Sequence, residues 1–236
     1  MMMKEKKGFT LIELMVALTL GLIILSVIMT LYINTIITSS DLIKSARINY
    51  DLNSALALMV SDIKRSGYWA GAKSDLNSPN NSFTQLKVPS VSCILYAYDA
   101  DANGSVDAKE YYGFKLKGTN IQVRLSGGAM DDCNASADDW QTLNVSEGNE
   151  QVVVTLLTFT TSYKCLRQRV GFVDVSYESS CARADATFGN LISGDNLIES
   201  RVIVIALEGH VKIDAVIIKK LAGQVKIRND PFYTKS

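Results

Sequence analysis

The stretch Phe9–Ile33, which reads FTLIELMVALTLGLIILSVIMTLYI, decides how the rest of the chain can fold. Glu13 is its only charged residue. At a rise of 1.5 Å per residue these residues make a helix about 37 Å long, enough to cross the hydrocarbon core of a membrane. No proline occurs between Phe9 and Ser66. We therefore expect one continuous helix, with a membrane-spanning segment at 9–33 and an amphipathic segment at 34–67.

Glu13 is unusual for a membrane helix, because a carboxylate in hydrocarbon is costly and is by default functional. The alternative is a charge tolerated near the headgroups, since Glu13 is only five residues into the apolar stretch. A cleaved secretory signal is disfavoured. The apolar stretch is too long, and residues 34–38 (NTIIT) do not form a small-residue cleavage site.

The letters K-G-F-T-L-I-E, from Lys7 to Glu13, followed by an apolar helix, resemble the class III signal of type IV pilins and pseudopilins. The resemblance implies that prepilin peptidase cuts between Gly8 and Phe9, removes the leader 1–8 and methylates the new amino terminus at Phe9. It also implies that Glu13 pairs with the amine of a neighbouring subunit when the helices stack.

Two further stretches resemble minor pilins of the PilW type: LNSALALMVSDIKRSGY at 52–68 and VKIRND at 225–230. This resemblance implies that the protein is first held in the inner membrane. It then joins other minor pilins and the major pilin to prime or cap type IV pilus assembly. Three alternatives stay open. They are a J-type pseudopilin of type II secretion, a major pilin, and a membrane-anchored calcium-binding ectodomain that does not assemble.

Charge indicates how the chain is oriented. The leader holds three lysines and one glutamate, so the positive-inside rule leaves the N-terminus in the cytoplasm and places the β-rich domain, 68–236, in the periplasm. The whole chain carries 24 basic and 24 acidic residues, a net charge of zero. We therefore expect no nucleic acid among its partners.

The four cysteines all follow the apolar stretch, and an even number in an exported domain indicates disulfides. Three pairings are possible. Cys93–Cys133 and Cys165–Cys181 are favoured because short loops close at the least entropic cost. The alternative is free, buried cysteines.

Residues Asp99–Glu110 match the loop pattern D-x-[DN]-x-[DN]-G-x₅-E of an EF-hand calcium site. Asp99, Asp101, Asn103 and Glu110 would be side-chain ligands, Ser105 would offer its carbonyl oxygen, and Asp107 would bind directly or through water. We expect structural calcium here, and the alternative is a solvated acidic turn. The flanks read as strands, so the loop is predicted to be an insert in a β-hairpin rather than part of a helix–loop–helix unit.

The predicted fold class is α+β, a pilin-like long helix packed on a mostly antiparallel sheet. An apolar stripe on the helix, formed by Ile48, Leu52, Ala55, Leu56, Met59 and Ile63, should face that sheet. Strands are expected at 93–98, 111–116, 121–125, 151–163, 197–207 and 210–221, with irregular segments at 68–89, 126–150 and 165–181. No catalytic motif occurs, so we predict that the protein is not an enzyme.

Overall fold

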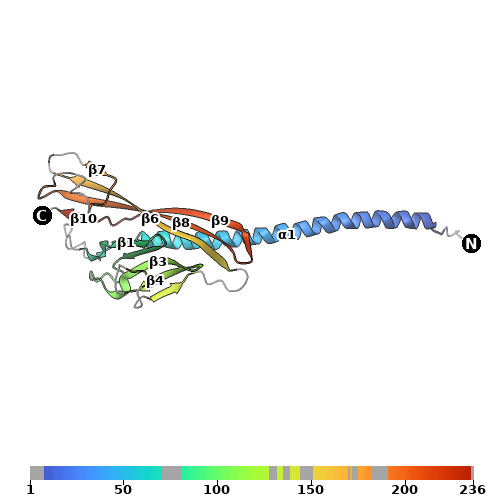
Figure 1. Cartoon of the computed structure of the whole chain (residues 1–236), viewed down its shortest axis with the longest axis horizontal. Helices are drawn as coiled ribbons and strands as arrows, with labels where there is room; N and C mark the ends of the chain where they lie inside the picture. Colours follow the sequence, from blue (N-terminus) through green and yellow to red (C-terminus); the bar gives the residue numbers. More distant parts are fainter. Residues whose placement is uncertain are drawn as a thin grey trace, which may run out of the picture. The chain divides into compact units, whose positions relative to one another are not determined.

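The computed structural model describes residues 8–70, 81–127, 132–134, 139–143, 151–169, 171, 175–181 and 191–234. Helix α1, Leu11–Ile63, is followed along the chain by short 3-10 helices and β-strands (Figure 1). The chain divides into two compact units, Met1–Ala46 and Arg47–Ser236. The end of α1 therefore belongs to the β-rich unit.

Among its described residues, the β-rich unit contains two antiparallel sheets. The first has the order β1-β2-β3-β4-β5, so neighbours in sequence are neighbours in the sheet. Its strands are β1 (Leu86–Ser90), β2 (Cys93–Ala97), β3 (Tyr111–Lys117), β4 (Asn120–Ser126) and β5 (Asp139–Thr142). The 3-10 helix η2 (Ser82–Thr84) precedes β1, and η3 (Ala108–Glu110) precedes β3.

The second sheet has the order β10-β8-β6-β7, with β9 also pairing with β8. Its strands are β6 (Val152–Gln168), β7 (Val175–Tyr177), β8 (Asn196–Val211), β9 (Asp214–Lys226) and β10 (Phe232–Thr234). β6 and β8 pair along almost their whole length, from Val152 opposite Val211 to Gln168 opposite Asn196. Every second residue of β8 is buried, the period-2 alternation of a strand with one face on a core.

The end of helix α1 supplies one side of the core. Ile48, Leu52, Ala55, Met59 and Ile63 are buried, and they join one hydrophobic cluster with residues of both sheets. Leu56, the sixth member of the predicted stripe, is half-buried and packs against the same cluster. Each fully buried side chain of this size contributes about 1.5–3 kcal/mol. The predicted stripe is therefore the face that holds the helix on the sheets.

Two strand glycines let helix α1 approach closely. A Cβ atom on Gly209 would lie 2.8 Å from the backbone oxygen of Val153 and 3.4 Å from Leu52. One on Gly223 would lie 2.9 Å from the side chain of Leu56. Side chains at these positions would push on the helix or on the neighbouring strand.

Asp62, in the last turn of helix α1, binds two tyrosines of the first sheet. Tyr96 donates a hydrogen bond to Asp62 Oδ2, and Tyr98 donates one to Oδ1 at 3.0 Å. Burial first, and then the Asp62 carboxylate, raise the pKa of both tyrosines above the ordinary 10.0. The guanidinium of Arg65 lies 4.0 Å from the ring centre of Tyr98. This cluster fastens the helix end to the sheet.

The end of the helix is closed by a residue far along the chain. Gly67 adopts a φ of +79°, the left-handed conformation common after a helix. Asn229 Nδ2 donates hydrogen bonds to the carbonyl oxygens of Ser66 at 3.1 Å and Arg65 at 3.4 Å. Carbonyls that the helix itself leaves without partners are satisfied in this way.

Disulfides join Cys93 to Cys133 and Cys165 to Cys181. This is the pairing favoured by loop length. The first disulfide joins β2 to Cys133, 40 residues later in the chain. The second joins β6 to Cys181, which lies shortly after β7.

The fold class is confirmed, but the expected single sheet is two. Several predicted boundaries were also wrong. β1 begins inside the segment 68–89 that was expected to be a loop, and β5 lies inside the segment 126–150 that was expected to be irregular. β6 runs on to Gln168 and pairs with β7, so the expected loop 165–181 contains sheet. These short or polar strands carry a weak pattern, and pairing with a neighbouring strand decides their conformation.

The last hairpin was also misplaced. Its turn falls at residues 212–213, so His210 lies within β8 rather than at the start of the next strand. β10 was not expected at all. Alternating apolar residues continue through the true end of β8, which hides its boundary.

Candidate functional site

The predicted cleavage site lies just before helix α1. Gly8 and Phe9 are exposed, with Phe9 at 90 %, and the helix begins at Leu11. Residues 1–7, most of the expected leader, lie outside the described residues. Within the described residues nothing packs over the Gly8–Phe9 bond closely enough to bury it, so a peptidase could reach it.

Thr10 and Glu13 form a reciprocal cap on the first turn of helix α1. Glu13 Oε2 accepts hydrogen bonds from Thr10 N at 3.0 Å and from Thr10 Oγ1 at 2.9 Å. The backbone N of Glu13 donates to Thr10 Oγ1 at 3.3 Å. This arrangement is a capping box, which satisfies backbone N–H groups that a helix start leaves unpaired. The role of Thr10 was not predicted, although T-x-x-E is a known sequence signal for this cap.

Most of the exposed surface of the first part of helix α1 is apolar. Between Leu11 and Ser40 the only charged residue is Glu13, and none of these residues is buried within the structure. The most apolar 18-residue window has a mean hydropathy of 2.6, and none of it is covered by the rest of the chain. By length and composition this helix can cross a membrane.

Residues Asp99–Glu110 lie in the connection between β2 and β3, which pair antiparallel. The prediction that the loop is an insert in a β-hairpin is confirmed. One carboxylate oxygen from each of Asp99, Asp101 and Glu110 lies within 4.8 Å of the other two. Asp99 is 1 % exposed and Glu110 2 %, whereas Asp101 is exposed. Three of the six expected ligands therefore come together.

The other three expected ligands have different partners. Asn103 Oδ1 accepts a hydrogen bond from Ser105 N at 2.7 Å, and Asn103 Nδ2 donates to Asp101 Oδ2 at 2.8 Å. Asp107 Oδ1 accepts from Lys109 N at 2.7 Å and caps helix η3. Calcium at this loop stays a prediction.

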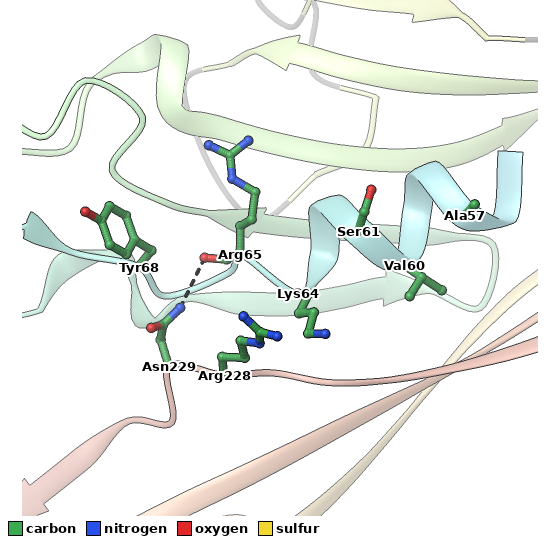
Figure 2. Close-up of a pocket in the computed structure, with 8 residues that line it drawn as sticks. All are labelled: Ala57, Val60, Ser61, Lys64, Arg65, Tyr68, Arg228 and Asn229. Carbon is green, nitrogen blue, oxygen red and sulfur yellow. Dashed lines mark hydrogen bonds between the residues drawn. The ribbon is translucent and has the colours of Figure 1, made fainter. Parts of the chain in front are cut away.

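A groove of about 750 Å³ borders the end of helix α1 (Figure 2). It is lined by Ala57, Val60, Ser61, Lys64, Arg65, Tyr68, Arg228 and Asn229. Arg65 donates to Tyr98 Oη at 3.0 Å, while no side-chain hydrogen bond or ion pair of Lys64 or Arg228 occurs within the described residues. None of the lining residues is buried, so the groove offers a cationic surface rather than an enclosed site. No sequence signal could have brought Lys64 and Arg228 together, because they are 164 positions apart.

Comparison with protein-family models gives two matches. Residues 41–227, about four fifths of the chain, match the family described as prepilin peptidase-dependent protein B. The chain belongs to the prepilin peptidase-dependent protein B family. Residues 3–29 match the prokaryotic N-terminal methylation motif. No curated protein and no solved structure matches the chain.

The two family matches divide the features of the site between them. The methylation motif covers Gly8, Phe9 and Glu13. The protein B match covers the acidic loop, all four cysteines and the helix residues that line the groove, and it ends just before Arg228 and Asn229. The resemblance to a type IV pilin-like minor pilin is thereby confirmed, whereas the PilW type is not. This family member carries an N-methylation signal, an apolar helix able to anchor it in a membrane, and a β-rich domain that follows it.

Proposed function

We propose that this protein is a minor type IV pilin. Prepilin peptidase cleaves it between Gly8 and Phe9 and methylates Phe9, and the mature protein joins other minor pilins and the major pilin to prime or cap pilus assembly. Its pilin-like family and its methylation motif support processing by prepilin peptidase. Pilin-like families are structural rather than enzymatic, in keeping with the lack of a catalytic motif in the sequence.

One observation carries the proposal: the exposed, mostly apolar surface of helix α1 between Leu11 and Ile33. An exposed apolar surface of this length is unfavourable in water and marks contact with a membrane or with protein. Lipid covers it while the protein waits in the inner membrane. The corresponding helices of neighbouring subunits cover it after assembly, because they present the same kind of surface.

Glu13 steers that assembly. Thr10 donates two hydrogen bonds to Glu13 Oε2, and within the described residues no group donates a hydrogen bond to Glu13 Oε1. Cleavage after Gly8 would create a cationic amine at Phe9. The free oxygen of Glu13 can accept a hydrogen bond from such an amine on the adjoining subunit, which neutralises both charges within the apolar bundle.

The orientation follows from the lysine-rich leader. The N-terminus stays in the cytoplasm, where the leader is cut off, and the β-rich domain lies in the periplasm until it reaches the cell surface in a pilus. A J-type pseudopilin of type II secretion would be processed in the same way. The partners that co-purify with the mature protein distinguish these two roles.

The test compares Gly8→Arg with Lys7→Arg, which introduces the same residue one position away and keeps the leader charge. Mass spectrometry of the membrane-extracted protein should find N-methylated Phe9 as the first residue in the native protein and in Lys7→Arg. Gly8→Arg should keep its leader and be absent from sheared fibres. A native protein that begins at Met1–Met3 with an unmodified residue would refute the proposal and leave a membrane-anchored ectodomain.

A further inference from the structure

The acidic loop between β2 and β3 contains two buried carboxyl groups that have no ion-pair partner among the described residues. Asp99 and Glu110 are 1 % and 2 % exposed. Within the described residues no lysine, arginine or histidine forms an ion pair with Asp99, Asp101 or Glu110. Buried carboxylates are costly unless they are paired or bind a metal.

Asp99 shows the need for a ligand most clearly. Its Oδ2 accepts hydrogen bonds from Ala70 N and Gly104 N, both at 3.0 Å. Its Oδ1 is buried and accepts no hydrogen bond within the described residues. Glu110, by contrast, accepts from Ala100 N at 2.8 Å through Oε1 and from Asp107 N at 3.1 Å through Oε2. Asp99 therefore keeps an unused, buried acceptor in the same cluster.

The spacing of the oxygens suits calcium. Ca²⁺ binds oxygen at about 2.3–2.6 Å, so a single ion can bridge oxygens that lie up to about 5 Å apart. One oxygen each from Asp99, Asp101 and Glu110 falls within that limit, at 4.8 Å or less from the others. The positive φ of Gly104, +80°, gives the sharp turn that the central glycine of such a loop provides.

We propose that Asp99–Glu110 is a calcium site that locks the β2–β3 connection onto the turn after helix α1. Asp99, Asp101 and Glu110 are its central ligands. Asn103, Asp107 and the Ser105 carbonyl complete the shell. This inference is independent of the proposed role in the pilus.

The loop already contacts that turn at several points. Trp69 Nε1 donates a hydrogen bond to the carbonyl of Gly104 at 3.0 Å, and Asp99 N donates to the carbonyl of Tyr68 at 2.9 Å. Ala70 N reaches Asp99 itself. An ion that fixes Asp99 and Gly104 thus also fixes the residues that follow the helix.

Calcium binding is measured on the purified full-length protein in detergent after treatment with a chelator. Titration with CaCl₂ should give one site with a Kd of about 10⁻⁴–10⁻³ M, the range of extracellular modules, and MgCl₂ should bind more weakly. About 10 mM CaCl₂ should raise Tm by about 3–10 °C. No heat of binding together with no change in Tm would overturn the proposal.

Single substitutions in the loop test whether its carboxylates bind the calcium ion. Asp101→Asn removes an exposed ligand and should leave the fold intact while weakening calcium binding at least about tenfold. Glu110→Gln should abolish it. Glu178→Gln removes an equally negative but exposed carboxylate, which pairs with Lys164, and should leave binding unchanged. Wild-type calcium affinity in both Asp101→Asn and Glu110→Gln would refute this location.

Trp69 offers a readout that does not depend on stability. Because its indole contacts the loop, Trp69 should sensitise the luminescence of Tb³⁺ bound in place of calcium. Excess CaCl₂ should displace Tb³⁺ and abolish the luminescence, and Trp69→Phe should reduce the luminescence per bound Tb³⁺ ion. Emission that survives Trp69→Phe undiminished, or that CaCl₂ does not displace, would place the ion elsewhere and contradict the proposal.

Discussion

Thr10 and Glu13 hold each other at the first turn of helix α1, with three hydrogen bonds between them at 2.9–3.3 Å. Glu13 therefore has a local partner as well as the intersubunit role that we propose for it. One oxygen of its carboxylate completes the helix cap, and the negative charge remains available to a neighbouring amine. The two roles can be separated by mutation.

Glu13→Gln should keep the cap and lose the charge, because glutamine can also accept the hydrogen bond in a capping box. We expect normal membrane insertion and roughly tenfold less protein in sheared fibres, since the amine of the neighbour is left unpaired in an apolar bundle. Immunoblots of membrane and fibre fractions measure both quantities. Thr10→Val is the matched control: it weakens the cap, keeps the charge, and should still assemble. Fibre levels of Glu13→Gln equal to the wild type would remove charge from the mechanism.

The two glycines beneath helix α1 should differ in how they tolerate alanine. A Cβ atom at Gly209 meets a backbone oxygen, that of Val153, so β6 must move. At Gly223 the nearest atoms belong to the side chain of Leu56, which is half-buried and can adopt another rotamer. We expect Gly209→Ala to cost about 1–3 kcal/mol of unfolding free energy and Gly223→Ala clearly less. Denaturant unfolding of the two variants tests this order, and the reverse order would show that the helix, not the strand, is the rigid partner.

Alkaline pH should unfold the domain through Tyr96 and Tyr98. Their pKa values are raised in the folded state, mainly by burial and then by Asp62. In the unfolded chain a tyrosine loses its proton near pH 10, while the folded state still keeps it. The contribution of these two tyrosines to stability should therefore be constant below about pH 10 and fall above it, by up to about 1.4 kcal/mol per pH unit for each tyrosine.

Tyrosinate absorbance and circular dichroism, followed together during a pH titration, measure this effect. Tyr96→Phe should be less stable at neutral pH, because Asp62 loses a donor, but its stability should depend less steeply on pH above 10. Tyr50→Phe changes a side chain that is 73 % exposed and serves as the control. An unchanged slope in Tyr96→Phe would contradict the assignment.

The two disulfides should contribute unequally to stability. They close segments with sequence separations of 40 and 16 residues. Chain-entropy estimates give about 4 kcal/mol for the first and about 3 kcal/mol for the second. Replacing both Cys93 and Cys133 by alanine should thus lower Tm more than replacing Cys165 and Cys181. Thermal unfolding of the two double variants, with the wild type under reducing conditions for comparison, tests the ranking, and equal or inverted losses would contradict it.

Much of the fold could be predicted from local pattern. The apolar stripe from Ile48 to Ile63 has the period of a helix with one buried face, and the hairpin around the acidic loop follows from β-prone flanks. Strand ends were less predictable. The turn at 212–213 interrupts a continuous alternation, and only the pairing of β8 with β9 reveals it.

The candidate sites likewise differ in how far they could be predicted from local sequence. The cleavage signal and the calcium-type loop are contiguous motifs, so their residues could be named in advance. The groove depends on Lys64 and Arg228, and the Asp62 cluster depends on Tyr96 and Tyr98, which approach only after the sheets have formed. No spacing rule connects residues so far apart, because the tertiary fold alone decides which of them meet.

The hydrogen bonds from Asn229 to the residues after helix α1 constrain the order in which the nascent chain can fold. Its first structural element is finished by a side chain made more than 160 residues later. Contacts of such long range form slowly, since a large loop must close before they give any stability. The N-terminal part of the helix can insert into a membrane early. The carbonyl groups after its C-terminal end, however, gain their hydrogen bonds from Asn229 only after nearly the whole chain has been synthesised.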